Sequence, residues 1–286
     1  MDRDTLSLSK KIALGVKSLF RLCAEISKRN ITVMQAILDI RMRLFNSQRS
    51  LRDDFDWTKY PRHYREELKS ISRKHTLNVE VGEFNLVNGE IILTDDSKPL
   101  HPNHRLLYEV VIELKPNSIR EIGFGSGDHL SNLSNMLPDS KLYGIDRSTE
   151  QFNTLRIRHP KLQVDLSVTD ITDRQIELET VDLSFTQAVL MHISDFNNRY
   201  LSAIENILDS TSNHIVLMEN WTQHDYTASI RQLTVSKPNW HNAKLYFKVS
   251  SENPNVRCMV VSNLPCSFPL LLNDDQLLQG RQLLTH

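Results

Sequence analysis

The chain has 286 residues, of which 40% are hydrophobic and 24% charged, and its formal net charge is -1. This length and composition are typical of a globular protein with one large domain and an appendage, and the small charge argues against nucleic acid as a bulk partner. Its three cysteines are too scattered for a disulfide framework or a zinc site, so no metal is expected. With acids near the start and no run of about 20 apolar residues, the sequence predicts a cytoplasmic protein.

The first 50 residues are expected to form a helical extension. Apolar residues recur at helical spacing in two pieces of residues 5–47, broken at 28–30, and the polar faces are rich in lysine and arginine. We expect this pair of helices to pack on the main domain or on a second copy in a homo-oligomer. The alternative is attachment to an anionic membrane surface, at its inner face, or to the acidic groove of a partner protein.

Residues 51–100 form a second segment of distinct character. It begins with DDFDWTKYPRHYREELKSISRK, which is dense in aromatic and charged residues. The run FNLVNGEIIL follows, and its Asn88-Gly89 pair between apolar stretches predicts a small two-residue β-hairpin. Residues 94–104 are predicted to be a loop that leads into a helix.

Residues 118–146 read as a strand, a glycine-rich turn, a helix and a second strand. Gly123, Gly125 and Gly127 lack a Cβ, so the backbone can turn tightly at the strand end, and we expect any side chain there to occupy ligand space. Asp146 ends the second strand. In a parallel sheet it lies on the same rim, where a carboxylate accepts both hydroxyls of a ribose. The segment therefore predicts a nucleoside ligand.

The acid before the glycines separates two kinds of nucleotide. Dinucleotide-binding turns usually read G-x-G-x-x-G, whereas this chain has E-x-G-x-G-x-G with Glu121 at the strand end. A carboxylate there repels a pyrophosphate and attracts a ligand that carries an ammonium and a sulfonium. The sequence thus predicts a cationic cofactor.

Further strands alternate with helices towards the C-terminus. Strands are predicted at residues 162–170, 181–193 and 214–220, with a helix at 196–208, and this alternation indicates a parallel sheet covered on both faces. The runs 244–250 and 256–263, joined by the turn-forming ENPN, should pair antiparallel.

The motif from Glu121 to Gly127, followed by Asp146, resembles that of the class I S-adenosylmethionine-dependent methyltransferases, and the resemblance covers roughly residues 100–263. It implies a Rossmann-like α/β fold with a mostly parallel seven-stranded sheet and a C-terminal antiparallel hairpin. The S-adenosylmethionine-binding domain would span residues 101–264, followed by a tail at 265–286. The positions implied to contact the cofactor are Glu121, Gly123, Gly125, Gly127, Asp146, Arg147, Thr169, Asp170, Ile171 and Gln187.

The resemblance also suggests roles for single residues. Asp170 would bind the adenine amino group, Ile171 would contact its ring, and Gln187 would face the sulfonium. Residues 51–100 would form a lid that shapes the acceptor pocket. This makes a group of its side chains candidates for acceptor contact, with a place in the core as the alternative: Trp57, Tyr60, His63, Tyr64 and Arg65.

Methyl transfer to a hydroxyl requires a base near the ends of the fourth and fifth strands. The candidates are His192, Glu219 and His224. The alternatives are that His192 binds backbone and that Glu219 orients a histidine.

The acceptor is suggested by resemblance alone. FTQAVL stands where N-P-P-Y would indicate methylation of DNA base amines or glutamine, and no acid cluster suggests a divalent metal. The overall pattern looks like methyltransferases of polysaccharide and surface-glycan assembly, which implies O-methylation of a sugar or glycan hydroxyl. The alternatives are N- or O-methylation of another small metabolite or peptide, an NAD-linked oxidoreductase, which Glu121 disfavours, and a non-catalytic scaffold.

Overall fold

The computed structural model describes residues 66, 68–95, 98–272 and 275–278. The predicted helical extension at residues 5–47 lies outside the described residues, as do the acceptor candidates Trp57, Tyr60, His63, Tyr64 and Arg65. No helix in the described part of the chain is long and apolar enough to cross a membrane.

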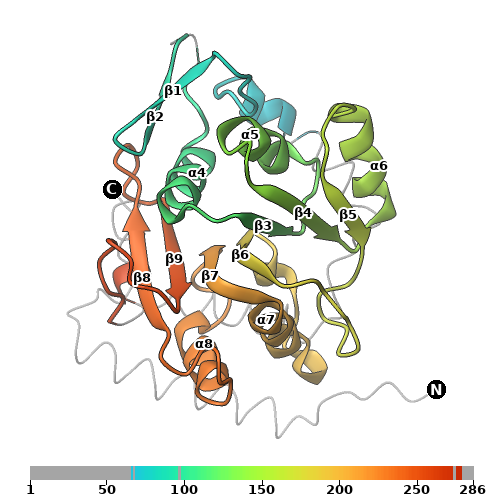
Figure 1. Ribbon diagram of the computed structural model, residues 1–286, viewed down its shortest axis with the longest axis vertical. Coiled ribbons are helices and arrows are strands. Elements are labelled where there is room, and N and C mark those ends of the chain that lie inside the picture. The colour runs from blue at the N-terminus through green and yellow to red at the C-terminus, as the bar shows by residue number, and fades with distance from the viewer. Residues whose placement is uncertain (1–65, 67, 96–97, 273–274, 279–286) are drawn as a thin grey trace, which may run out of the picture. The chain divides into compact units, whose positions relative to one another are not determined.

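Seven strands form the central sheet: β3 (Ser118–Ile122), β4 (Lys141–Asp146), β5 (Asp165–Val168), β6 (Val181–Gln187), β7 (Thr211–Met218), β8 (Lys244–Val249) and β9 (Arg257–Ser262). Their order is β5-β4-β3-β6-β7-β9-β8 (Figure 1). The five strands from β5 to β7 pair in parallel, whereas β9 pairs antiparallel with both β7 and β8. The mostly parallel sheet with an antiparallel C-terminal hairpin is therefore confirmed.

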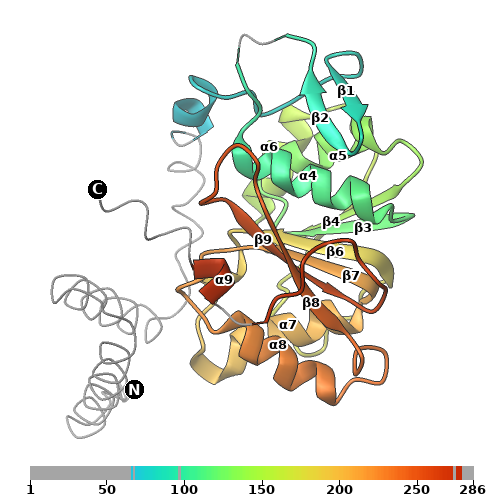
Figure 2. The same cartoon turned by 90° about the vertical axis from the view of Figure 1, so that its left-hand side faces the viewer.

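Helices cover both faces of this sheet (Figures 1 and 2). One face carries α4 (Pro102–Leu114), α5 (Asp128–Met136) and α6 (Thr149–Arg158), and the other carries α7 (Arg199–Asp209) and α8 (Tyr226–Val235). Each face has its own apolar cluster, with Leu107 and Leu133 in the first and Ile204 and Ile230 in the second. Burial on both faces explains why central strands such as β3 are almost continuously buried.

The helix predicted at residues 196–208 begins later than expected. Residues Phe196–Asn198 form a short 3-10 turn, and α7 begins at Arg199. The reason is that Asn197 and Asn198 have φ angles of 53° and 59°, in the left-handed region that an α-helix cannot contain.

The predicted small hairpin is present as β1 (Phe84–Val87) and β2 (Glu90–Leu93). Asn88 and Gly89 join the strands with φ angles of 53° and 82°, as a two-residue hairpin turn requires. The hairpin packs on α4 through Ile91, whose backbone N–H donates to the Glu109 carboxylate at 3.4 Å.

The chain beyond β9 returns along the edge of the sheet. The Phe247 N–H donates to the Pro269 carbonyl at 3.0 Å, and the Leu271 N–H donates to the Leu245 carbonyl at 2.8 Å. A short helix, α9 (Asp275–Leu278), follows and lies near β9. The described part of the segment predicted as a tail is thus packed against the sheet.

Candidate functional site

The glycine-rich turn lies between β3 and α5. Gly123 and Gly127 have φ angles of 74° and 80°. A Cβ on Gly123 would lie 2.5 Å from the Val189 side chain, and one on Gly127 would lie 2.4 Å from Leu155. Glycine is therefore needed at both positions because of backbone conformation and close protein neighbours. This corrects the expectation that a side chain at these two positions would occupy ligand space.

Asp146 holds the turn from the next strand. Its carboxylate accepts the Gly125 N–H at 3.0 Å and the Ser148 N–H at 2.9 Å. Burial raises the pKa of Asp146, although these two hydrogen bonds oppose the change. A carboxylate has about four lone-pair sites, so Asp146 keeps acceptor capacity for ligand hydroxyls.

Glu121 is a buried acid with an unsatisfied oxygen. Its residue is 2% exposed, and its Oε2 has no hydrogen-bond partner within the described part of the chain. Burial raises the pKa of Glu121 well above its usual range, and the nearby Asp146 and Asp128 raise it further. Asp128, by contrast, is bound by Arg158 at 2.6 Å and His159 at 3.0 Å. Glu121 Oε2 is therefore available to a hydrogen-bond donor or a cation of a ligand.

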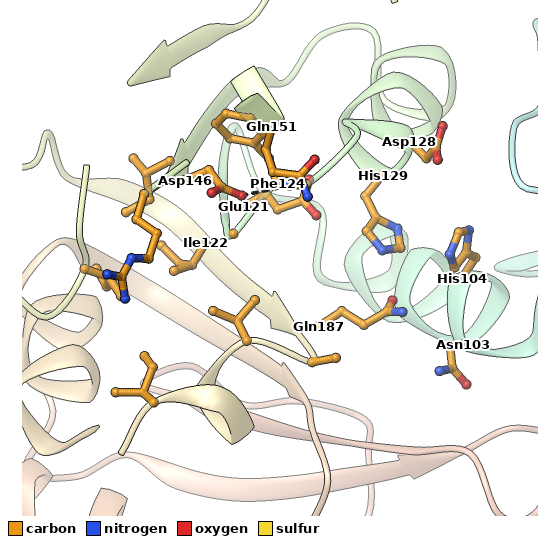
Figure 3. A pocket seen from close by; sticks show the side chains of 18 of the residues that line it. Asn103, His104, Glu121, Ile122, Phe124, Asp128, His129, Asp146, Gln151 and Gln187 are labelled. Atoms are coloured by element: carbon orange, nitrogen blue, oxygen red, sulfur yellow. Dashed lines mark hydrogen bonds between the residues drawn. The ribbon is translucent and has the colours of Figure 1, made fainter. Parts of the chain in front are cut away.

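These groups line a cavity of about 360 Å³, here named the first cavity (Figure 3). This volume is in the range of small-molecule sites. All of the predicted cofactor residues except Gly127 line it, and Gly127 is the N-cap of α5. Leu68, Ile71 and Leu77, from the segment before the hairpin, line it as well.

One end of the first cavity carries Asp170 and Ile171. Asp170 accepts two hydrogen bonds from Thr172, at 2.9 Å and 2.8 Å, and one from Arg199 at 3.1 Å. Burial by itself would raise the pKa of Asp170, but the hydrogen bonds from Thr172 and the charges of Arg147 and Arg199 outweigh it and lower the pKa. Ile171 is buried. Their contacts with adenine stay a prediction.

The opposite end carries histidines that the sequence analysis did not single out. Figure 3 shows His129, His104, Asn103 and Gln187 gathered there, away from Asp146. The ring centroids of His104 and His129 are 4.4 Å apart, and those of His101 and His104 are 5.2 Å apart. The signals were present as H-x-x-H at the start of α4 and as the histidine two residues after Gly127.

A buried hydrogen-bond network supports His129. Asn132 donates to the Tyr108 hydroxyl at 2.8 Å, and this hydroxyl lies 2.8 Å from His129 Nδ1 and 3.5 Å from His104 Nδ1. Burial lowers the pKa of His129 to about 4 and holds that of His104 well below its usual range. Both imidazoles are therefore neutral at pH 7, and the burial that keeps them neutral also opposes their protonation.

A second cavity of about 330 Å³ adjoins the first. Asn103, Gln187 and Ala188 line both cavities. The remaining walls of the second cavity come from the 3-10 turn after β6, the end of β7 and the residues after it, the turn between β8 and β9 with the start of β9, and α9: Met191, Met218, Glu219, Asn220, Trp221, Asn255, Val256, Arg257, Leu277 and Leu278.

The three base candidates lie in different surroundings. Glu219 lines the second cavity, but its oxygens accept the N–H groups of Val189, Leu190 and Met191 at 3.0, 3.2 and 3.1 Å. His224 is stacked on Tyr200, with centroids 3.9 Å apart, and its side chain is 2% exposed. His192 ends the 3-10 turn Leu190–His192. Neither histidine is among the described residues that line the two cavities.

The first cavity fits S-adenosylmethionine. The unsatisfied Glu121 oxygen matches an ammonium donor, whose positive charge would favour the ionised carboxylate. Asp146 would accept the ribose hydroxyls, and Ile171 would contact the adenine ring.

A comparison with protein families agrees with this fit. A family model described as a methyltransferase domain matches residues 119–211. Among solved structures, the methyltransferase domain of bacterial CtHen1-CN is 13% identical, with 56% of this chain and 97% of that chain covered and a TM-score of 0.45.

Two further structures are similar at the same level. The N-methyltransferase NodS from Bradyrhizobium japonicum WM9, in complex with S-adenosylhomocysteine, is 18% identical over 55% of this chain and 83% of that chain, with a TM-score of 0.40. The magnesium protoporphyrin IX methyltransferase ChlM from Synechocystis PCC 6803, with bound S-adenosylmethionine, is 14% identical over 57% and 80%, with a TM-score of 0.43. The domain match covers the strands that build the first cavity, so residues 119–211 form a methyltransferase domain whose cavity fits S-adenosylmethionine.

Proposed function

We propose that the enzyme methylates a hydroxyl group of a sugar or glycan. The observation that carries this proposal is the second cavity, which meets the first at Gln187 and Ala188. Amide side chains from Asn103, Gln187, Asn220 and Asn255 line it beside Trp221. Amides both donate and accept hydrogen bonds, as hydroxyl groups do, and an indole offers a flat face to the C–H groups of a sugar ring.

The cofactor supplies a methyl group on a positively charged sulfur. The chain must align the acceptor and remove its proton, because a neutral hydroxyl is a weak nucleophile. Gln187 lies where the two cavities meet, and its Oε1 has no partner within the described part of the chain. It can therefore accept a hydrogen bond that orients the acceptor.

His129 is the base that the geometry favours. Its Nδ1 contacts the Tyr108 hydroxyl at 2.8 Å, and the hydroxyl proton can serve only one of the two imidazoles beside it. When Tyr108 donates to His104, His129 donates through Nδ1 and keeps a lone pair on Nε2. A proton taken up at Nε2 makes His129 an imidazolium whose Nδ1–H still donates to the Tyr108 hydroxyl.

The other base candidates remain predictions to be tested beside His129. Glu219 already accepts three backbone N–H groups, and burial raises its pKa. His224 lies in an aromatic cluster with Tyr200 and Tyr226. His129 differs because it lines the first cavity.

The test is a methyl-transfer assay with radiolabelled S-adenosylmethionine and a panel of monosaccharides, glycosides and glycan fragments. Matched non-sugar hydroxyls, amines and peptides serve as controls. We expect label in sugars as a methyl ether, which survives alkali, and mass spectrometry would give the position. Label that alkali releases as methanol would indicate an ester, and label only in amines, peptides or less polar alcohols would contradict the proposal.

Trp221 provides a variant that separates acceptor from cofactor. Trp221→Leu should raise the KM for the sugar while the affinity for S-adenosylhomocysteine stays unchanged, because Trp221 lines only the second cavity. An unchanged KM in Trp221→Leu would count against stacking.

We also propose that residues 5–47 mediate homo-oligomerisation, with surface attachment as the alternative, in a cytoplasmic enzyme. The basic amphipathic pattern of this segment supports the proposal. Light scattering of the full chain and of a variant that lacks these residues, with and without anionic vesicles, distinguishes the outcomes. The same number of protomers in both proteins and no vesicle binding would contradict it.

A further inference from the structure

Arg257 brings a positive charge to the second cavity. It is the first residue of β9 and lines this cavity beside the turn that precedes it. Its side chain is partly buried, and desolvation lowers its pKa. An arginine nevertheless stays charged in proteins. The cavity therefore contains a permanent cation.

The partners of Arg257 are neutral. Its Nε donates to the Pro254 carbonyl at 3.0 Å, and its Nη1 donates to the Gln276 carbonyl. No side-chain carboxylate that the structure describes pairs with it, and its Nη2 makes no hydrogen bond within the same residues. Other arginines near the cavities differ, since Arg105 pairs with Glu252 at 2.9 Å and Arg199 pairs with Asp170 at 3.1 Å.

Among the residues that the structure describes, no carboxylate of the second cavity pairs with Arg257. Glu219 is the carboxylate among the described lining residues, and its oxygens accept three backbone N–H groups rather than the guanidinium. The other polar side chains of the lining are the neutral amides described above. A partly desolvated guanidinium gains most from a carboxylate or phosphate, which it can bind through two parallel hydrogen bonds.

We propose that the second cavity binds an acceptor that carries an anionic group, a carboxylate or a phosphate, against Arg257. This inference rests on the proposed function, because it takes the second cavity as the acceptor site. It narrows the acceptor to an acidic sugar, such as a uronic acid, or to a sugar phosphate. Arg257 would then position the acceptor without touching the reacting atoms.

The experiment uses matched probes on the full chain saturated with S-adenosylhomocysteine. Calorimetry would compare glucose with glucuronic acid and glucose 1-phosphate, and benzyl alcohol with benzoate and phenyl phosphate. The variants are Arg257→Gln and Arg257→Lys. The matched control is Arg231→Gln, because Arg231 also donates to backbone carbonyls, those of Leu271 and Leu272, and is not among the described lining residues of either cavity.

The wild type should bind at least one anionic probe about 10-fold more tightly than its neutral partner. Arg257→Gln should remove this preference, Arg257→Lys should keep part of it, and Arg231→Gln should leave it unchanged. The carboxylate and phosphate probes show which anion is preferred. Unchanged affinity for S-adenosylhomocysteine and an unchanged melting temperature would show that the variants are folded.

Several results would overturn the anion site. They are equal binding of anionic and neutral probes, equal loss of both in Arg257→Gln, and no binding of any probe. If neutral sugars are methylated with an unchanged KM in Arg257→Gln, the anion site fails while the proposed function stands. If only benzoate or phenyl phosphate binds, and Arg257→Gln removes this binding, the anion site stands while the sugar acceptor fails.

Discussion

The two cavities meet at Gln187 and Ala188 but are built in different ways. The first is built at the carboxyl ends of parallel strands, where the sheet fixes the turn after β3 and the acid at the end of β4. The second is built from side chains after β7, between β8 and β9, and on α9. Loop side chains can change while the fold is kept. If the second cavity is the acceptor site, as we propose, the fold specifies the cofactor and segments at its antiparallel edge specify the acceptor.

The largest expected effect is a loss of cofactor affinity that concerns the first cavity alone. Asp146→Ala removes the acceptor of the Gly125 N–H and the proposed acceptor of the ribose hydroxyls. Loss of such charge-assisted hydrogen bonds costs about 3 kcal/mol, or roughly 100-fold in affinity. Calorimetry with S-adenosylhomocysteine measures this loss. Binding to the second cavity, probed with a sugar, should change much less.

The control is Asp173→Ala, which removes an exposed acid whose carboxylate accepts the Gln175 N–H at 3.0 Å. This variant should keep wild-type affinity. If Asp146→Ala also binds S-adenosylhomocysteine as tightly as the wild type, the assignment of the first cavity is wrong.

The next effect tests the histidines that line the first cavity. His129→Ala should lower kcat roughly 100-fold, because general base catalysis contributes about that much or more. The affinity for S-adenosylhomocysteine should fall far less. His241→Ala is the control, since His241 is exposed and contacts the Pro238 carbonyl.

The same assay on His192→Ala and His224→Ala tests the candidates chosen from sequence. A large loss of kcat in either variant, together with unchanged kcat in His129→Ala, would move the base away from the histidines of the first cavity.

Local backbone demands explain which features were predictable. The hairpin at Asn88-Gly89 and the turn at Gly123 and Gly127 need positive φ angles that few residues adopt, so the residue types reveal them. Asp146 was predictable because parallel strands end on one rim. Residue type did not reveal the start of α7. Two asparagines adopt positive φ angles there, and asparagine tolerates such angles but does not require them.

Contacts between distant segments explain what was missed. His101 and His104 reach His129 only because α4 and α5 pack on the same face of the sheet. The second cavity combines Asn103, Trp221 and Arg257 from three separate parts of the chain. No local spacing in the sequence marks such a site. The sequence analysis therefore found base candidates only near the ends of strands.

A smaller expected effect is the pH dependence of stability, which should differ between residues of the two cavities. The pKa of His129 is lowered to about 4 in the folded state, whereas a histidine in an unfolded chain titrates near 6.5. Between these values the unfolded chain binds more protons, so the stability that the neutral ring contributes is present above about pH 6.5 and is lost as pH falls towards 4. From pH 7.5 to 5 this loss is at most about 2 kcal/mol.

The measurement is denaturant unfolding of wild type and His129→Asn at both pH values. Glu121 and Glu219 have raised pKa values, so they gain stability on acidification, opposite to His129. Subtracting the change in unfolding free energy of the variant from that of the wild type removes their contributions. The wild type should lose more stability on acidification than the variant. The second cavity has no histidine among its described lining residues, so Trp221→Leu should keep the wild-type pH dependence. Equal slopes for wild type and His129→Asn would contradict a buried, neutral His129.

The smallest effect concerns the turn that both cavities share. Glu219→Gln keeps the shape of the side chain but places an NH₂ group where one carboxylate oxygen accepts an N–H from residues 189–191. An unsatisfied N–H costs roughly 1–2 kcal/mol, which unfolding experiments can detect. If Glu219 only holds the turn, stability and acceptor KM should change while kcat falls less than about 10-fold. If Glu219 were the base, kcat would fall at least about 100-fold with little change in stability. Val189 lines the first cavity and Met191 lines the second. A loosened turn should therefore weaken the binding of cofactor and of acceptor together. Neither Asp146→Ala nor Trp221→Leu should do this.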